Sequence, residues 1–160
     1  MAATPINSKS YGDETLEIIA FRLHDQEFCV KTTTIREIRG WAPSTPIPHA
    51  PADVIGVMNL RGSVIPIIDL AYKLGMESTV ANERSAIVVA EVHNMVIGML
   101  VDRVSDILTI GSDQVQPVPE VTASFDRSYC EGIIATENGM ICFLNLAKMF
   151  KETEAEELAA

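Results

Sequence analysis

The chain has 160 residues, 48% of them hydrophobic, and a formal net charge of −10 at pH 7. This length suits one compact unit or two very small ones that bury a real core. Such a negative charge, without a long basic stretch, disfavours nucleic acid and anionic membrane surfaces as partners, because both repel it. Residues 1–15 lack the apolar region of a secretory signal, and no apolar run reaches the roughly 18 residues of a membrane span. We therefore expect a cytoplasmic protein without direct membrane insertion.

The first half of the chain, residues 16–74, begins after residues 1–15, which we expect to be a disordered tail. Apolar and turn residues predict a hairpin with strands over 16–23 and 27–30. Thr34 and Glu37 fit a capping box, which predicts a short helix that ends near residue 39. The prolines that follow, between residues 43 and 51, indicate an extended connector.

A second hairpin is predicted over residues 54–60 and 64–68, around Arg61 and Gly62. Pro66 lies in its second strand, which predicts an edge strand or a bulge there because proline cannot donate a ladder hydrogen bond. Asp69 can cap one helical turn over 70–74, and Gly75 can close it.

The second half, residues 75–150, predicts the same order of elements. Strands are expected over 85–92, 95–101 and 104–110, and a closing hairpin over 133–135 and 140–144 turns through Asn138 and Gly139. Asn145 can cap a C-terminal helix with an apolar face, and residues 151–160 form its charged end.

An internal repeat relates the two halves. Residues 18–38 fall on 87–107 with an offset of 69, and residues 56–70 fall on 132–146 with an offset of 76, in pattern more than in identity. We interpret 16–74 and 75–150 as two related β-barrels of about five short strands that share a core, since closure removes exposed edges. Chance similarity of short hairpins is the alternative.

The three cysteines, Cys29, Cys130 and Cys142, are an odd number in apolar, strand-like contexts. This favours reduced core residues over a disulfide framework or a zinc site. A redox-active site at Cys130 or Cys142 is one alternative function, and a small-ligand-binding barrel is another. Motifs for phosphate, dinucleotide or metal binding are absent from the sequence, so we expect no enzyme, no cofactor and no metal.

The segment over residues 55–70, IGVMNLRGSVIPIIDL, closely resembles the signature of the CheW family of bacterial chemotaxis coupling proteins. Residues 35–40 and 97–108 are similar to two further family blocks, and the likeness covers about 16–150. The resemblance implies two SH3-like five-stranded barrels packed together, with short helices. It also implies an adaptor that bridges the cytoplasmic tips of chemoreceptors to the histidine kinase CheA in membrane-associated arrays. Without a kinase or receiver segment, a free-standing coupling protein is the better interpretation.

The same resemblance implies two sets of site residues. The receptor-binding set is Ile35, Glu37, Ile38, Val57, Arg61 and Val104. The kinase-binding set is Gln116 and Val121, and Val121 is smaller than the residue common in the family. Structural roles compete with several of these assignments: Glu37 could only complete the capping box, Ile35 and Ile38 could bury one face of the helix, and Arg61 could be a solvated turn residue.

Overall fold

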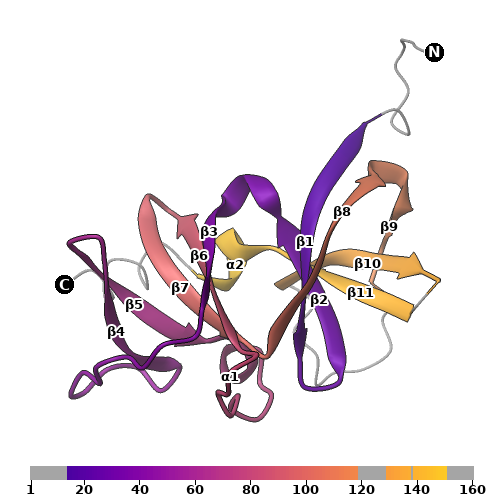
Figure 1. Cartoon of the computed structure of the whole chain (residues 1–160). Coiled ribbons are helices and arrows are strands. Elements are labelled where there is room, and N and C mark those ends of the chain that lie inside the picture. Colours follow the sequence, from indigo (N-terminus) through magenta and orange to yellow (C-terminus); the bar gives the residue numbers. More distant parts are fainter. Residues whose placement is uncertain (1–13, 119–128, 138, 151–160) are drawn as a thin grey trace.

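A computed structural model of the chain describes residues 14–118, 129–137 and 139–150. This part is mostly β, with two curved sheets side by side and two very short α-helices (Figure 1). The expected fold of two small SH3-like barrels packed together is confirmed. Most of the expected tail and all of residues 151–160 lie outside the described residues, but Thr15, which we assigned to the tail, is already in a strand.

Eleven described strands form the two sheets. Sheet A contains β1 (Thr15–Leu23), β2 (Gln26–Lys31), β8 (Arg103–Gly111), β9 (Val115–Gln116), β10 (Cys130–Thr136) and β11 (Gly139–Leu144). Sheet B contains β3 (Ile35–Gly40), β4 (Val54–Leu60), β5 (Ser63–Asp69), β6 (Ala86–Val92) and β7 (Met95–Val101). The strand orders are β8-β1-β2-β11-β10-β9 in sheet A and β3-β6-β7-β5-β4 in sheet B. Sheet A thus has one strand more than predicted, the two-residue β9.

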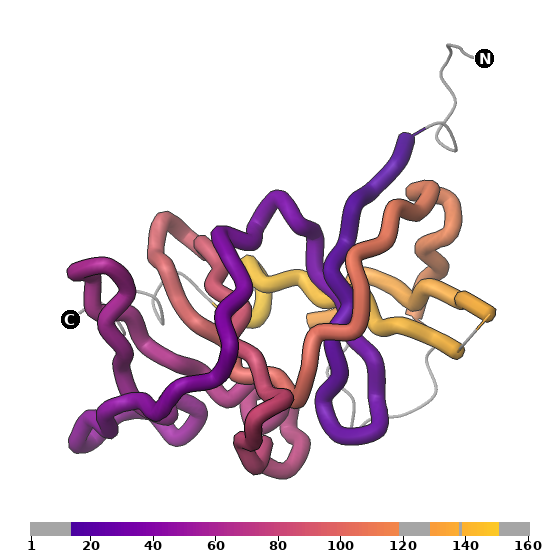
Figure 2. The backbone as a smooth tube through the Cα atoms, viewed as in Figure 1, coloured from indigo at the N-terminus to yellow at the C-terminus, as the bar shows by residue number. Residues whose placement is uncertain are grey.

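The two sheets do not follow the expected division of the chain at residue 74. The β1–β2 hairpin of the first half joins β8–β11 of the second, and the β6–β7 hairpin of the second half joins β3–β5 of the first. The chain therefore passes from one sheet to the other and back (Figure 2). Parallel pairs of β2 with β11 and of β5 with β7 hold the exchanged hairpins in place. Each barrel consequently needs strands from both halves.

Strand registers repeat with the two offsets found in the sequence. Ile18 pairs with Leu108 in sheet A, and Ile87 pairs with Arg39 in sheet B, so both partners differ by 69. The register shift between Val54 and Gly56 in β4 recurs 76 residues later, between Cys130 and Gly132 in β10. This agreement favours a repeat over chance similarity of hairpins.

One hydrophobic cluster is shared by both sheets, as the repeat interpretation anticipated. Phe21 and Phe28 come from sheet A, Val88 and Met99 come from sheet B, and all four are almost fully buried. Smaller clusters lie around Cys29 and Phe143 in sheet A and around Leu60 and Val89 in sheet B. Burial of apolar surface between the sheets, at about 25 cal/mol per Å², stabilises their association.

The predicted caps at Asp69 and Asn145 are confirmed. In α1 (Leu70–Lys73), Oδ1 of Asp69 accepts a hydrogen bond from the backbone N–H of Tyr72 at 3.2 Å. In α2 (Leu146–Met149), Oδ1 of Asn145 accepts one from the backbone N–H of Lys148 at 3.1 Å. Leu146 and Met149 of α2 lie in the core that both sheets share, so this single turn packs against both sheets.

The predicted helix after Thr34 is wrong. Residues Thr32–Thr34 form one 3-10 turn, and residues Ile35–Gly40 form β3, which pairs with β6. Only six residues are available, too few for a stable helix, and Ile35 and Ile38 are β-branched. Pairing with the buried β6 therefore prevails over the local capping pattern, and Glu37 is a strand residue.

Pro66 is accommodated differently from the prediction. Its strand, β5, lies inside sheet B between β7 and β4 rather than at an edge. The ladder between β5 and β7 starts only at Ile67, and the bulge lies in the opposite strand between Val54 and Gly56. The missing N–H of Pro66 therefore falls before the parallel ladder begins.

Candidate functional site

Strands β3 and β8 are equivalent edge strands that flank the junction of the two sheets (Figure 1). Each ends its sheet, β3 in sheet B and β8 in sheet A, so one side of each strand pairs with no strand of its own sheet. An open strand edge is a ready surface for another protein. The capping pattern had predicted a helix over Ile35, Glu37 and Ile38, whereas the structure places them along one of these edges.

Each edge strand carries one apolar residue packed on the core and one turned to solvent. Ile35 on β3 and Val104 on β8 both pack against the shared core. Ile38 is 41% exposed, and Ile107, its counterpart at an offset of 69, is 55% exposed. The sequence-based site omits Ile107, although the repeat already aligns it with Ile38. Each edge strand thus exposes one isoleucine at an equivalent position, and an exposed apolar residue on an open edge is a candidate contact for another protein.

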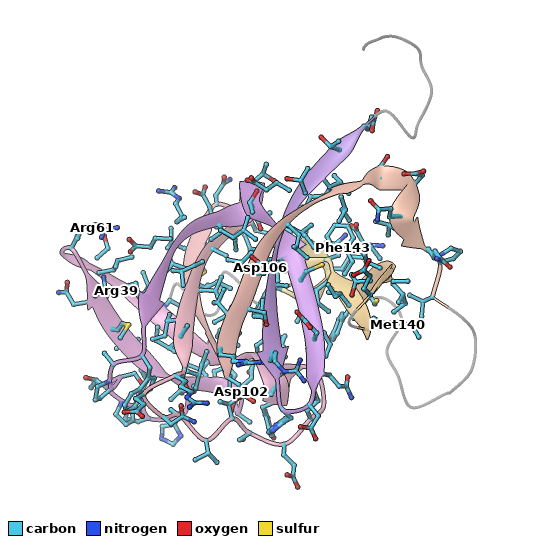
Figure 3. The ribbon with its side chains drawn as sticks, turned by 45° about the vertical axis from the view of Figure 1, so that its right-hand side comes forward. Arg39, Arg61, Asp102, Asp106, Met140 and Phe143 are labelled. Carbon is cyan, nitrogen blue, oxygen red and sulfur yellow. The ribbon has the colours of Figure 1, made fainter. Side chains whose placement is uncertain are left out.

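Glu37 and Arg61 form an ion pair at the end of sheet B. Nη2 of Arg61 lies 3.0 Å from Oε1 of Glu37, and Nη1 of Arg39 lies 3.8 Å from the same oxygen. The Arg61 side chain remains 69% exposed, so it lies outside the core, as expected. Figure 3 shows Arg61 at the tip of the β4–β5 hairpin, with Arg39 on the same flank. The Arg61 guanidinium can therefore contact a partner, and the Glu37 carboxylate, which is partly exposed, still has Arg39 nearby.

A tight turn holds Arg61 in this position. Arg61 has φ 51° and Gly62 has φ 89°, the combination of a type I′ hairpin turn. Oδ1 of Asn59 accepts a hydrogen bond from the backbone N–H of Gly62 at 2.8 Å. Because a type I′ turn matches the twist of the strands it joins, the direction of the arginine side chain is set by the backbone.

The corresponding positions at the end of sheet A carry different charges. In the repeat, Asp106 is equivalent to Glu37, and Glu137 is equivalent to Arg61. Both are acidic, so they cannot form an ion pair with each other. Oδ1 of Asp106 instead accepts the backbone N–H of Ile107 at 2.8 Å. Figure 3 shows Asp106 and Asp102 near the middle of the view, along β8 and the residue just before it. The two edges are therefore alike in apolar residues and unlike in charge.

The remaining predicted site residues lie elsewhere. Val57 is half-buried on β4, where its N–H and C=O both bond to Thr45 at 2.8 Å. Gln116 is on β9, at the far edge of sheet A, beside a surface pocket of about 590 Å³. Val121 lies outside the described residues. The structure thus brings Glu37 and Arg61 into contact, sets Ile35 and Val104 on one core, and separates Gln116 from them.

The pocket beside Gln116 mixes charged and apolar side chains. Its lining residues are Arg22, Asp25, Gln26, Glu27, Gln116, Pro117, Ile133, Gly139, Met140 and Cys142. Met140 is 73% exposed on this side (Figure 3). Among residues 14–118, 129–137 and 139–150, no three His, Cys, Asp or Glu side chains are grouped so that they could hold a metal ion. No helix in the described part of the chain is long and apolar enough to cross a membrane.

Two small β-barrels with a shared core and an open, partly apolar edge on each define a β-barrel protein-binding module. The chain matches the CheW-like domain over residues 17–154, and it therefore belongs to the CheW-like family. The resemblance identified from the sequence is confirmed.

Several known proteins are similar over nearly the whole chain. A probable chemotaxis protein CheW of Rhizobium etli is 50% identical and aligns over 94% of this chain and 96% of its own. The chemotaxis protein CheW of Rhizobium meliloti is 51% identical over 88% of this chain and 90% of its own. The crystal structure of the scaffolding protein TtCheW from Thermoanaerobacter tengcongensis superposes with a TM-score of 0.79 at 28% identity, over 88% of this chain and 96% of that one.

Proposed function

We propose that this chain is a chemotaxis scaffold that bridges the cytoplasmic tips of chemoreceptors to the histidine kinase CheA. Relatives named as chemotaxis proteins share half of its residues over almost its full length. A structural neighbour of the same fold is described as a scaffolding protein. In this role the chain works in the cytoplasm, is recruited to receptor arrays and needs no catalytic group of its own.

The observation that carries the proposal is the composition of the sheet B edge. Ile38 supplies exposed apolar area, and the Glu37–Arg61 pair beside it supplies charges of both signs. A helical receptor tip would place its apolar face on Ile38 and Ile35 and a polar side chain against Arg61. The arginine fork suits a carboxylate or the carbonyls at a helix end. We assign the receptor contact to this edge.

The kinase contact is assigned to the opposite side of sheet A. Gln116 lies there on the short edge strand β9, beside the pocket and the exposed Met140. A two-residue edge strand leaves backbone groups that a strand of a partner barrel could pair with. With the receptor on β3 and the kinase near β9, both partners could bind at once, as bridging requires.

A charge reversal at Arg61 tests the receptor contact. Arg61→Glu should lower affinity for a purified receptor signalling fragment at least about tenfold, a loss of about 1.4 kcal/mol. It should leave affinity for the regulatory domain of CheA unchanged, because Gln116 is at the far edge of sheet A. The matched control is Glu137→Lys, which reverses a charge at the equivalent hairpin tip.

Titration of all three proteins against both partners separates the outcomes. Loss of receptor binding in Arg61→Glu, with receptor binding of Glu137→Lys unaffected, supports the assignment. Equal receptor affinity in all three would remove Arg61 from the contact. If the wild type bound neither partner, the bridging function itself would be wrong. Thermal melting of each variant identifies a change in fold.

A further inference from the structure

Cys130 and Cys142 bring their sulfur atoms together across the β10–β11 hairpin. The two Sγ atoms are 2.6 Å apart, whereas a disulfide bond measures about 2.04 Å. Cys130 pairs with Leu144, and Cys142 pairs with Ile133, so the thiols are diagonal neighbours. The register shift between Cys130 and Gly132 makes this diagonal contact possible. The two sulfur atoms are therefore in direct contact, and a small side-chain adjustment would allow a disulfide bond.

The two cysteines differ in their surroundings from Cys29. Cys142 is half-buried and lines the pocket beside Gln116, so small solutes can reach this side of the pair. Cys130 is 6% exposed and does not line the pocket, so a peroxide must pass Cys142 to reach its sulfur. Cys29 is fully buried within sheet A, where burial raises the pKa of its thiol to about 12. Because it is fully buried, Cys29 should be the least accessible of the three to an oxidant.

The environment also separates the two thiols of the pair. A hydrogen bond from the Cys142 thiol, with further backbone hydrogen bonds, lowers the pKa of Cys130 to about 7 despite burial. The same hydrogen bond, together with burial, raises the pKa of Cys142. Cys130 is therefore the more readily ionised thiol of the pair, and a thiolate is the nucleophilic form of cysteine.

We infer that Cys130 and Cys142 form an oxidation site at which a hydroperoxide creates an intramolecular disulfide. The Cys130 thiolate attacks the distal oxygen of the peroxide, the O–O bond breaks, and Cys130 becomes a sulfenic acid. With hydrogen peroxide the leaving hydroxide takes up a proton to become water. The Cys142 sulfur then attacks Cys130 Sγ, the S–O bond breaks, and a second water carries away the Cys142 proton. Two thiols and one peroxide give one disulfide and two waters.

The repeat shows that the fold does not require this pair. The positions 76 residues earlier hold Val54 and Pro66, on the equivalent strands and around the equivalent register shift. Apolar residues without a thiol therefore fill these places in sheet B. The backbone places two side chains together in both sheets, and only in sheet A are these side chains thiols that can be oxidised.

Peptide mapping after peroxide treatment tests the site. The folded full chain, reduced beforehand, is exposed to equimolar hydrogen peroxide at pH 7, alkylated and digested. We expect a peptide cross-link between Cys130 and Cys142, a mass loss of two hydrogen atoms, and full reversal by a dithiol reductant. Cys29→Ser should behave like the wild type. Cys142→Ser should instead accumulate a sulfenic acid on Cys130, which a dimedone-type probe traps.

Three results would overturn the inference: thiols that remain free under these conditions, a cross-link that involves Cys29 or a second chain, or direct over-oxidation of Cys130 without a cross-link. If a variant does not fold, the wild-type map alone decides, because it names both linked residues. Cys130→Val, which copies the residue at the equivalent position of sheet B, supplies a folded control that should form no cross-link. A cross-link in that variant would also contradict the site.

Discussion

The β4–β5 and β10–β11 hairpins are the same structure used in two ways. Both have a register shift at their start, a glycine just after it and a capped helical turn at their end, with every position offset by 76. The β4–β5 hairpin carries Arg61 at its tip, where it pairs with Glu37. The β10–β11 hairpin instead carries Cys130 and Cys142 near its base. Backbone geometry is kept in both copies, and the chemistry differs where side chains reach the surface.

The largest expected effect comes from adding a side chain to the glycine that follows the register shift in each of the two hairpins. A Cβ at Gly56 would lie 2.4 Å from the carbonyl oxygen of Thr45, and a Cβ at Gly132 would lie 2.6 Å from the carbonyl oxygen of Gln116 and 2.5 Å from Cγ1 of Val115. Gly56→Ala and Gly132→Ala should each cost about 2–3 kcal/mol of unfolding free energy, because in both a strand-paired backbone would have to move. Urea denaturation measures both.

Gly40→Ala is the control for this pair. A Cβ there would meet nothing within 4 Å, so the change should stay within about 0.5 kcal/mol of the wild type. If Gly56→Ala and Gly132→Ala were as mild as Gly40→Ala, the close approach of neighbouring backbone would not be the reason for glycine at these two positions.

Sequence reasoning succeeded where local chemistry decides the structure. Hairpin positions and both helix caps followed from apolar alternation, turn residues, Asp69 and Asn145. It failed after Thr34, because pairing with β6 outweighs a local capping pattern over six residues.

Two further features depend on long-range pairing. The exchange of hairpins between the two barrels does not follow from the sequence, since a hydrophobic pattern shows which face of a strand is buried but not which sheet the strand joins. The contact of Cys130 with Cys142 was missed because it arises only through the bulge in β10.

The two caps should differ in strength. Asp69 is 5% exposed and its carboxylate accepts hydrogen bonds from the backbone N–H groups of Tyr72 and Thr79. Asp69→Ala should therefore cost about 2 kcal/mol, the upper end for a cap, whereas Asn145→Ala should cost about 1 kcal/mol. Asp69→Asn, which keeps an acceptor oxygen, is the matched variant and should recover part of the loss. Equal costs at both caps would show that the Thr79 contact adds nothing.

The Glu37–Arg61 pair should stabilise the fold only weakly. The arginine is largely solvated, so a double-mutant cycle with Glu37→Gln and Arg61→Gln should give a coupling energy of about 0–1 kcal/mol, smaller in high salt. The measurement is urea denaturation at two salt concentrations. A coupling above about 2 kcal/mol would make the pair a structural element of sheet B and weaken its assignment to a partner.

The smallest expected effect concerns His24 in the β1–β2 turn. Nε2 of His24 lies 2.7 Å from the carbonyl oxygen of Glu77, and this hydrogen bond raises the pKa of the histidine, with a further contribution from Asp102. A raised pKa in the folded state adds stability below the unfolded value of about 6.5 and loses it as pH rises through the folded value. His24→Asn keeps a residue that tolerates the φ of 56°. The difference in melting temperature between wild type and variant should therefore shrink from pH 5.5 to pH 8.

Titration of His24 by NMR measures the pKa directly. Asp102→Asn removes a negative charge while it retains an oxygen that can accept the backbone N–H of His24. Its His24 midpoint should fall below that of the wild type, because the attraction that favours the charged imidazole is reduced. A wild-type midpoint at or below about 6.5 would contradict the assignment. An unchanged midpoint in Asp102→Asn would show that the charge of Asp102 does not contribute, and would leave the Glu77 carbonyl as the main cause.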